Sequence, residues 1–405
     1  MTLDGLIRWA QSGWQVAGPS APDVLARHLR LIAHNRTSRV QTIKSAPDIV
    51  KVHPANQPPT NQPNYTRPNG DVVIPVYNNY DDTRQLLDAL SRDRSFEGAI
   101  IIVHDASPDM RLTPKLRTFA ASDPRVRLLE NEVNLGFVQT CNRGIAASRA
   151  DVVILNTDID LPEGAVGRIL RRLQSSPDIA SATPFSNNAY CVGLPNLVYP
   201  NALPFSAPVA AIDACLRAMP VASEITLPSG NGFCMGISRA ALNKVGAFDE
   251  QFGHGYGEET DFCQRAIAHG LRHVLASDVY VGHKGGRSFG ASWENRSREG
   301  LLKVLDRHPE FVDRVRVYLG NGEARAFTLA ALLRLAQERS GKPLIMVCEA
   351  NANVQTLPDP RTPRLILARQ GRDAIATLVL GEEHYAFRFA ETEVLHRALR
   401  FAGID

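Results

Sequence analysis

The chain has 405 residues, of which 44% are hydrophobic and 21% charged, and its formal net charge is +3. This composition is typical of a well-cored, water-soluble protein of more than one domain, and the small net charge argues against nucleic acid as a partner. No apolar run approaches the roughly 20 residues that cross a bilayer, and the N-terminus lacks the apolar core of a signal peptide.

The N-terminal region differs from the rest of the chain in charge and in proline content. The segment LARHLRLIAHNR (25–36) has helical spacing and a basic face. It predicts a helix that either packs on the main domain or rests on an anionic membrane surface or partner. VHPANQPPTNQPNYTRPNG (52–70), with its five prolines, predicts a linker. We therefore expect a basic helical extension over 1–51 and a linker over 52–70.

After the linker, short β-branched runs alternate with helical patterns. The runs predict buried strands at 71–77, 99–105, 126–131 and 151–158. The segments between and after them predict helices at 81–93, 112–121, 138–148 and 162–175. This alternation predicts an α/β fold with a mostly parallel sheet and helices on both faces. Ligands of such sheets bind outside the carboxyl ends of the strands.

The residues that follow these strands are therefore the first candidates for a site. The strand ends read Pro75-Val76-Tyr77-Asn78, His104-Asp105-Ala106-Ser107, Asn134-Leu135-Gly136-Phe137 and Asn156-Thr157-Asp158-Ile159-Asp160. The first strand–helix turn contains neither GxGxxG nor GxxxxGK[ST], which argues against a dinucleotide-binding dehydrogenase and a P-loop NTPase.

Asp158 and Asp160 stand two positions apart at a strand end. If the backbone stays extended, both carboxylates point to one side and suit a hard divalent ion that also holds a diphosphate. Alternatively, Asp158 forms a turn and Asp160 caps the next helix ahead of Pro162. The spacing alone does not separate these two interpretations.

Three carboxylates, Glu258, Glu259 and Asp261, crowd into GYGEETDFCQR (255–265). Acidic residues suit the first turn of a helix, where the macrodipole favours negative charge. A carboxylate in a cleft can instead take a proton from an attacking hydroxyl. The segment alone favours the first interpretation.

Taken together, these motifs resemble those of the family-2 glycosyltransferases, whose nucleotide-sugar-binding fold is called GT-A. The matching segments, in order, are IPVYN, VHDAS, NLGFVQTCNRGI, LNTDID, GNGFCMGISRAALNKVGAFDEQFGHGYGEETDFCQRA and HKGGRSFG (283–290). The resemblance covers residues 70–310, and SATPFSNN (181–188) is similar to a bacterial surface-polysaccharide subgroup. Two departures are His104 and Ala106, which stand where the family usually has Asp and Gly.

The resemblance implies a donor site for a uridine or thymidine diphosphate sugar. Asp105 would accept a hydrogen bond from the nucleobase, and Asp158 would lie near the ribose and the metal. Asp160 would ligate Mg²⁺ or Mn²⁺, with His283 as a further metal or diphosphate contact. The remaining donor-site residues would be Pro75, Val76, Tyr77, Asn78, Asn134 and Gly136.

The resemblance also changes the interpretation of the acidic trio. Glu259 stands at the position of the family's base, with Glu258 and Asp261 as the other two acids. Glu259 would deprotonate a hydroxyl of a glycan or lipid-linked acceptor, and in-line displacement would invert the anomeric centre. The glycines around His254 and Tyr256 suggest a loop that closes over the substrates.

The remaining chain predicts a helix at 323–340, strands at 343–350, 364–369, 376–381 and 385–390, and a helix at 391–403. We expect a catalytic domain over 71–310 and a small accessory α/β module over 311–405. The six scattered cysteines, without a CxxC pair, argue against a zinc site or a disulfide framework and favour a cytoplasmic protein, at most peripheral to a membrane.

Two other functions remain open at this point. A sugar-1-phosphate nucleotidylyltransferase uses a related sheet but needs a Gly-rich signature with Arg after the first strand, which is missing here. The altered 104–107 motif also fits a catalytically weak nucleotide-sugar-binding scaffold of a polysaccharide-assembly complex.

Overall fold

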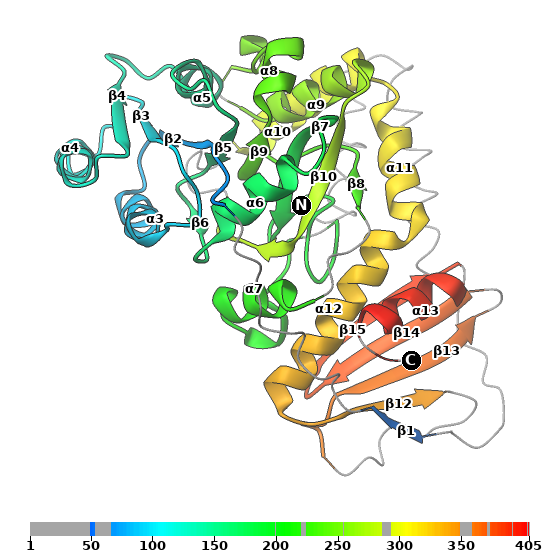
Figure 1. Cartoon of the computed structure of the whole chain (residues 1–405). Helices are drawn as coiled ribbons and strands as arrows, with labels where there is room; N and C mark the ends of the chain where they lie inside the picture. The colour runs from blue at the N-terminus through cyan, green and yellow to red at the C-terminus, as the bar shows by residue number, and fades with distance from the viewer. Residues whose placement is uncertain are drawn as a thin grey trace.

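The computed structural model describes residues 49–52, 66–198, 200–219, 224–253, 255–285, 293–348, 359–370, 373–390, 392–402 and 404. The helix predicted at 25–36, most of the predicted linker and His254 lie outside these residues. The described chain forms a large α/β domain and a smaller C-terminal sheet, and a run of helices connects the two (Figure 1).

The large domain is built on one eight-stranded sheet. Its strands are β2 (Asp71–Val76), β3 (Ile100–His104), β4 (Val126–Glu130), β5 (Val152–Leu155), β7 (Ile179–Phe185), β8 (Thr226–Leu227), β9 (Cys234–Ile237) and β10 (Arg272–Tyr280). Their order is β4-β3-β2-β5-β9-β7-β10-β8. The first four are parallel, whereas β9 runs antiparallel to both neighbours. The apolar runs of β2, β3 and β5 are completely or almost completely buried, as expected for strands covered on both faces.

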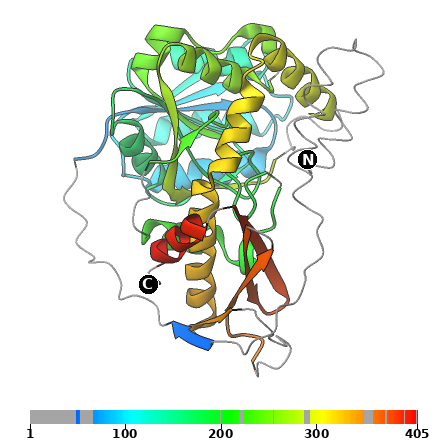
Figure 2. The ribbon, with the colours of Figure 1, turned by 90° about the vertical axis from the view of Figure 1, so that its right-hand side faces the viewer.

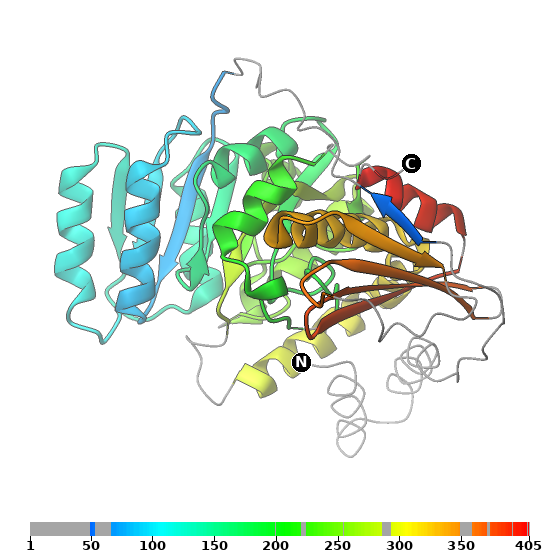
Figure 3. The same ribbon diagram turned by 90° about the horizontal axis from the view of Figure 1, so that it is seen from below.

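Helices cover both faces of this sheet (Figures 1 and 3). One layer contains α3 (Tyr80–Arg92), α4 (Leu112–Ser122), α6 (Ala165–Leu173) and α7 (Val209–Arg217). The other contains α5 (Phe137–Ala146), α8 (Arg239–Val245) and α9 (Glu258–Ala268). The predicted mostly parallel sheet with helices on both faces is therefore confirmed, and each predicted strand and helix of residues 71–175 is present with ends shifted by a few residues.

A two-stranded ribbon and two short 3₁₀ helices complete this domain. β6 (Ile159–Asp160) pairs antiparallel with β11 (Gly282–His283). The 3₁₀ helices are η3 (Pro204–Ser206) and η4 (Glu250–Phe252). The ribbon matters for the site because it joins the turn after β5 to a segment more than 100 residues later.

Three consecutive helices lead away from the large domain: α10 (Trp293–Arg307), α11 (Phe311–Asn321) and α12 (Glu323–Ser340). α12 packs against α7 on one side and the C-terminal sheet on the other, and its Phe327 stacks on Phe185 with ring centroids 5.9 Å apart. Twelve of its residues are buried, which explains its Ala/Leu-rich sequence. Within the part of the chain described, no helix combines the length and apolarity needed to cross a membrane.

The C-terminal sheet has five strands. They are β1 (Ile49–Val52), β12 (Leu344–Cys348), β13 (Arg364–Gln370), β14 (Asp373–Leu380) and β15 (Glu383–Phe389), in the order β1-β12-β13-β14-β15. Helix α13 (Thr392–Phe401) packs on β14, β15 and α12. The predicted C-terminal α/β module is therefore present.

The position of β1 was not predicted. Residues 49–52 were assigned to the helical extension and the linker, yet they form an edge strand that pairs antiparallel with β12 (Figure 2). The short run IVKV alternates apolar residues with a lysine, which is a weak strand signal without its partner in view.

One prediction follows from the packing of α5 on the sheet. A Cβ atom on Gly144 would lie 2.4 Å from Val73 Cγ1 and 3.2 Å from Val103 Cγ2, both on rigid strands. Gly144→Ala should therefore destabilise the protein by about 1–3 kcal/mol, although alanine is the better helix former. The measurement is the free energy of unfolding in urea.

Gly320→Ala is the matched control, because a Cβ at this position in α11 meets no atom within 4 Å. It should be neutral or stabilise by up to about 1 kcal/mol. Equal effects of the two substitutions would contradict the close approach of α5 to β2 and β3.

Candidate active site

A cavity of about 1030 Å³ opens at the carboxyl ends of the parallel strands, where ligands of such sheets bind. Most residues singled out from the sequence line it together: Pro75, Val76, Tyr77, Asn78, Asp105, Asn134, Gly136, Asp158, Glu258, Glu259 and His283. Two others, Asp160 and Asp261, do not belong to this lining. The strand ends and the segment after Gly257 thus meet in one cavity.

Asp105, after β3, lies at the floor of the cavity with only 3% of its surface exposed. Its Oδ1 accepts hydrogen bonds from Asn131 Nδ2 (2.7 Å) and the Leu135 amide (2.8 Å). Its Oδ2 accepts one from the Gly136 amide (2.9 Å). Asp105 therefore fixes the loop that carries Asn134 and Gly136 against the cavity.

The turns after β2 and β3 are tied to each other. The Asn78 amide donates to Ser107 Oγ (3.0 Å), and the Ser107 amide donates to His104 Nε2 (3.3 Å). Burial lowers the pKa of His104, which suits a neutral ring that accepts this bond. Ala106 has a φ of 47°, a left-handed conformation that glycine adopts without strain. This explains why a glycine is the usual residue at such a turn.

The β6–β11 ribbon brings Asp158 and His283 together. Asp158 lies in the turn between β5 and β6 and accepts a hydrogen bond from the Gly285 amide at Oδ2 (3.1 Å). Its Oδ1 lies 3.7 Å from His283 Nε2. His283 Nδ1 is 2.6 Å from the Asn188 carbonyl oxygen, so Nδ1–H donates and Nε2 is the ring nitrogen on the side of Asp158. The ring also stacks on Phe233.

This arrangement fits a divalent cation bound partly by substrate. A metal-ligating histidine usually donates its other N–H to a carbonyl or carboxylate, as His283 does to Asn188. Within the described ranges, no cluster of three or more His, Cys, Asp or Glu side chains has a metal-binding arrangement. Asp158 and His283 would thus supply two ligands, as in magnesium sites completed by phosphate oxygens and water.

Asp160 is placed differently from Asp158. The chain turns at Thr157 and Asp158 instead of staying extended, so the rule that residues two apart share a side does not apply. Asp160 pairs with Gly282 in the ribbon and stays outside the cavity lining. Burial raises the pKa of its carboxyl, with Lys284 acting against that shift.

Glu258 and Glu259 also line the cavity. Both belong to the first turn of α9, whose preceding residue Gly257 has a left-handed φ of 103°. Glu258 is 3% exposed, and its Oε2 has no hydrogen-bond partner among the described residues. Glu259 Oε2 accepts from the Gly257 amide (3.3 Å). Burial is the main cause that raises the pKa of both carboxyls, and for Glu258 the neighbouring Glu259 adds to it.

Helix α10 packs very closely against Tyr256, just before α9. A Cβ on Gly300 would lie 1.8 Å from the Tyr256 carbonyl oxygen, so only glycine permits the contact. Four residues earlier on the same helix, Arg296 lines the cavity, as does Tyr256. Burial raises the pKa of Tyr256 to about 12, so its hydroxyl remains protonated at neutral pH.

Several lining or supporting residues were not assigned a role from the sequence. Asn187 and Asn188 hold His283, and both lie in the SATPFSNN segment that had been noted only as a family resemblance. Phe233 follows the GNG motif, and its place under His283 depends on the fold. Arg296 lies outside every motif used, so no sequence signal identified it.

Part of the chain is similar to known proteins. Residues 71–192 match the family model for glycosyl transferase family 2. The chain is 30% identical over 119 residues to an N-acetylglucosaminyltransferase of Bradyrhizobium elkanii, covering 28% of this chain and 64% of the relative. It is 32% identical over 111 residues to the uncharacterized protein y4gI of Sinorhizobium fredii (strain NBRC 101917 / NGR234), covering 26% of this chain and 12% of that protein. The chain thus spans less than two thirds of either curated relative.

Among the solved structures that are similar to this chain is a mannosyltransferase, PcManGT from Pyrobaculum calidifontis, in complex with GDP-Man and Mn²⁺. It has a TM-score of 0.47 and 17% identity, covering 84% of this chain and 85% of the other. GalNAc-T7 with UDP, GalNAc and Mn²⁺ has a TM-score of 0.47 and 15% identity, covering 64% and 51%.

The buried glutamate pair predicts a pH-dependent gain of stability in Glu258→Gln. Because burial raises the pKa of Glu258, the folded state binds more protons than the unfolded state above pH ~4.3, and stability falls as pH rises. The substitution removes this loss, so Tm at pH 8 should rise by roughly 2 °C or more. At pH 4.5 the difference should shrink. Thermal unfolding at the two pH values tests this, and an equal offset at both would contradict it.

Proposed function

From the match of residues 71–192 to glycosyl transferase family 2, we propose that the protein is a glycosyltransferase. It transfers a sugar from a nucleoside-diphosphate donor to a hydroxyl of an acceptor. The observation that carries this proposal is the shared cavity, which Glu258 and Glu259 line together with the Asp158–His283 pair. A proton acceptor and a diphosphate-binding pair in one cavity are what such a transfer needs.

Glu259 acts as the base. An acceptor hydroxyl is a weak nucleophile, and its attack on the anomeric carbon needs a carboxylate within hydrogen-bond reach. Burial raises the pKa of both carboxyls, and the charge of Glu259 raises the pKa of Glu258 further, so Glu258 is the carboxyl that holds a proton more readily and Glu259 the better base. In-line attack by the acceptor hydroxyl inverts the configuration at the anomeric carbon.

The donor diphosphate would bind near Asp158 and His283. These two side chains would hold Mg²⁺ or Mn²⁺, which would offset the charge of the departing diphosphate as a Lewis acid. Arg296, from α10, adds a guanidinium to the same cavity. The base of a uridine or thymidine nucleotide lies against the turn of Pro75, Val76 and Tyr77.

Asn78, Asp105, Asn134 and Gly136 complete the nucleotide end. Since Asp105 already accepts three hydrogen bonds from the protein, its part in recognising the base is to shape the Asn134–Gly136 loop while offering remaining acceptor capacity.

The acceptor that we propose is a glycan or lipid-linked molecule of a bacterial surface polysaccharide, with transfer on the cytoplasmic side of a membrane. The support is the sequence pattern of the SATPFSNN segment. The basic segment 25–36, a proposed peripheral contact, lies outside the described residues. The division into an extension, a linker, a catalytic domain over 71–310 and an accessory module remains part of this proposal.

A nucleotide-sugar-binding scaffold with weak turnover is the second candidate. The observations that favour it are the strained Ala106 turn and the position of Asp160 outside the cavity. The Glu259 experiment below separates the two functions, because a scaffold loses nothing when its base is removed.

Glu259→Gln should lower kcat by about 10²–10⁴-fold, because amide replaces the base while the size of the side chain is kept. Sugar transfer and donor hydrolysis are measured with a panel of nucleotide sugars. Binding of the nucleoside diphosphate, followed by calorimetry, should change by less than about threefold. Activity retained within tenfold would refute the assignment of the base.

His283→Ala should remove most of the metal dependence of nucleotide binding. The readout is the ratio of UDP or dTDP dissociation constants without and with Mn²⁺, which should fall toward one because His283 supplies one of the two protein ligands. His269→Ala, an exposed histidine after α9, is the control and should keep the wild-type ratio. An unchanged ratio in His283→Ala would exclude this metal site.

A further inference from the structure

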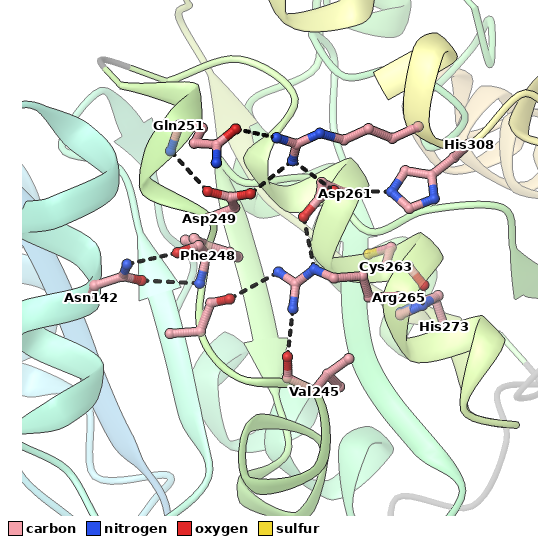
Figure 4. Close-up of polar contacts among 12 residues, drawn as sticks. Asn142, Val245, Phe248, Asp249, Gln251, Asp261, Cys263, Arg265, His273 and His308 are labelled. Carbon is pink, nitrogen blue, oxygen red and sulfur yellow. Dashed lines mark hydrogen bonds and ion pairs between the residues drawn. The ribbon is translucent and has the colours of Figure 1, made fainter. Parts of the chain in front are cut away.

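Asp261, one of the three acids predicted from the sequence to be catalytic, does not line the cavity and instead lies in a cluster of polar side chains (Figure 4). It is 2% exposed. Its Oδ2 accepts from Arg265 Nε (2.8 Å), and its Oδ1 accepts from His308 Nε2 (2.9 Å) and Arg307 Nη1 (3.4 Å). Three donors from α9 and from the end of α10 thus converge on one carboxylate.

The two arginines extend this cluster to the segment between α8 and η4. Arg265 donates to the carbonyls of Val245 (2.6 Å) and Ala247 (2.9 Å). Arg307 donates to Asp249 Oδ2 (2.7 Å) and Gln251 Oε1 (2.6 Å). The cluster therefore holds residues 245–251, the segment between α8 and η4 together with most of η4.

α5 holds the same segment from the other side. Asn142 Nδ2 donates to the Phe248 carbonyl (2.8 Å), and the Phe248 amide donates back to Asn142 Oδ1 (3.1 Å), as Figure 4 shows. His273, in β10, stands 3.0 Å from the Cys263 carbonyl through Nε2 and so holds the middle of α9. Several contacts thus hold α9 and the segment that precedes it.

Helix α10 connects the Asp261 cluster to the cavity. Its C-terminal end is bonded to Asp261, its middle is locked against Tyr256 at Gly300, and Arg296 lies near its N-terminal end. Arg296 and Arg307 are about 16 Å apart along the helix axis, at ~1.5 Å per residue. Any rotation or slide of α10 at Arg307 therefore displaces Arg296 relative to Glu258 and Glu259.

We propose that Asp261 is a positioning residue that docks α10 on α9 and so sets the place of Arg296 in the cavity that Glu258 and Glu259 also line. Asp261 does not line this cavity itself, and it acts through Arg307 and His308. The consequence for catalysis rests on the proposed function, whereas the docking itself does not. Of the three acids, Glu258 and Glu259 then serve the substrates, and Asp261 holds α10 in place.

The first test is hydrogen–deuterium exchange of the unliganded full chain carrying Asp261→Asn. Exchange should accelerate at least tenfold in residues 245–253 and 296–307, with α3 (80–92) unchanged. Asp306→Asn, an exposed acid on the same helix, is the matched control and should match wild type. Unchanged protection of α10, or a uniform increase over the whole chain, would overturn the proposal.

The second test separates positioning from catalysis. Asp261→Asn should keep about 1–10% of kcat and raise the donor KM several-fold, as a displaced Arg296 requires. Glu259→Gln should lose turnover with its donor affinity kept. An Asp261→Asn protein as inactive as Glu259→Gln, with wild-type KM and wild-type exchange, would make Asp261 a catalytic group and end the positioning proposal.

A pair of substitutions at His308 covers the case in which Asp261→Asn fails to fold. Gln places an N–H near the position of His308 Nε2, so His308→Gln should retain near-wild-type exchange in α10, whereas His308→Ala should resemble the Asp261 variant. Equal behaviour of the two would overturn the proposal. If wild type transfers no sugar from any nucleotide donor, the proposed function fails, and the exchange data still decide the role of Asp261.

Discussion

Two adjacent carboxylates kept largely out of water are the constraint on which this structure depends. Glu258 and Glu259 repel each other, and burial opposes the ionisation of either. The first turn of α9 offsets part of that cost, since its free amides and dipole favour negative charge. Two features keep α10 against the start of α9: the close approach of Gly300 to Tyr256 and the ionic cluster around the buried Asp261. Glu258 and Glu259 thus start helix α9 and also line the cavity.

Much of the large domain could be predicted from residues 71–175. Runs such as VVI and IIIV indicate strands buried on both faces, and parallel sheets collect ligand-binding residues at one edge. That rule explains why side chains from four separate strand ends and from the segment after Gly257 line a single cavity. The local turn chemistry agrees, because Asn78 and Asn79 adopt positive φ, as asparagine tolerates.

What could not be predicted depends on contacts between distant segments. A single turn at Thr157–Asp158 separates Asp158, in the cavity, from Asp160, outside it, and spacing alone does not reveal that turn. Asp261 and Glu258 both belong to the first turn of α9. Their surroundings differ because Arg307 and His308, at the end of α10, bind Asp261. Arg296 reaches the cavity from a helix without a motif, and Asn187 and Asn188 support His283 from almost 100 residues away.

The pairing of β1 with β12 has a consequence for biosynthesis. These strands lie about 300 residues apart in the sequence, and the complete eight-stranded sheet of the large domain lies between them. During translation at ~5–20 residues per second, β1 leaves the ribosome roughly 15–60 seconds before β12 exists. For that time IVKV is a nascent segment without its sheet. The C-terminal sheet is therefore completed last, when β1 and β12, which flank the large domain in the sequence, can pair.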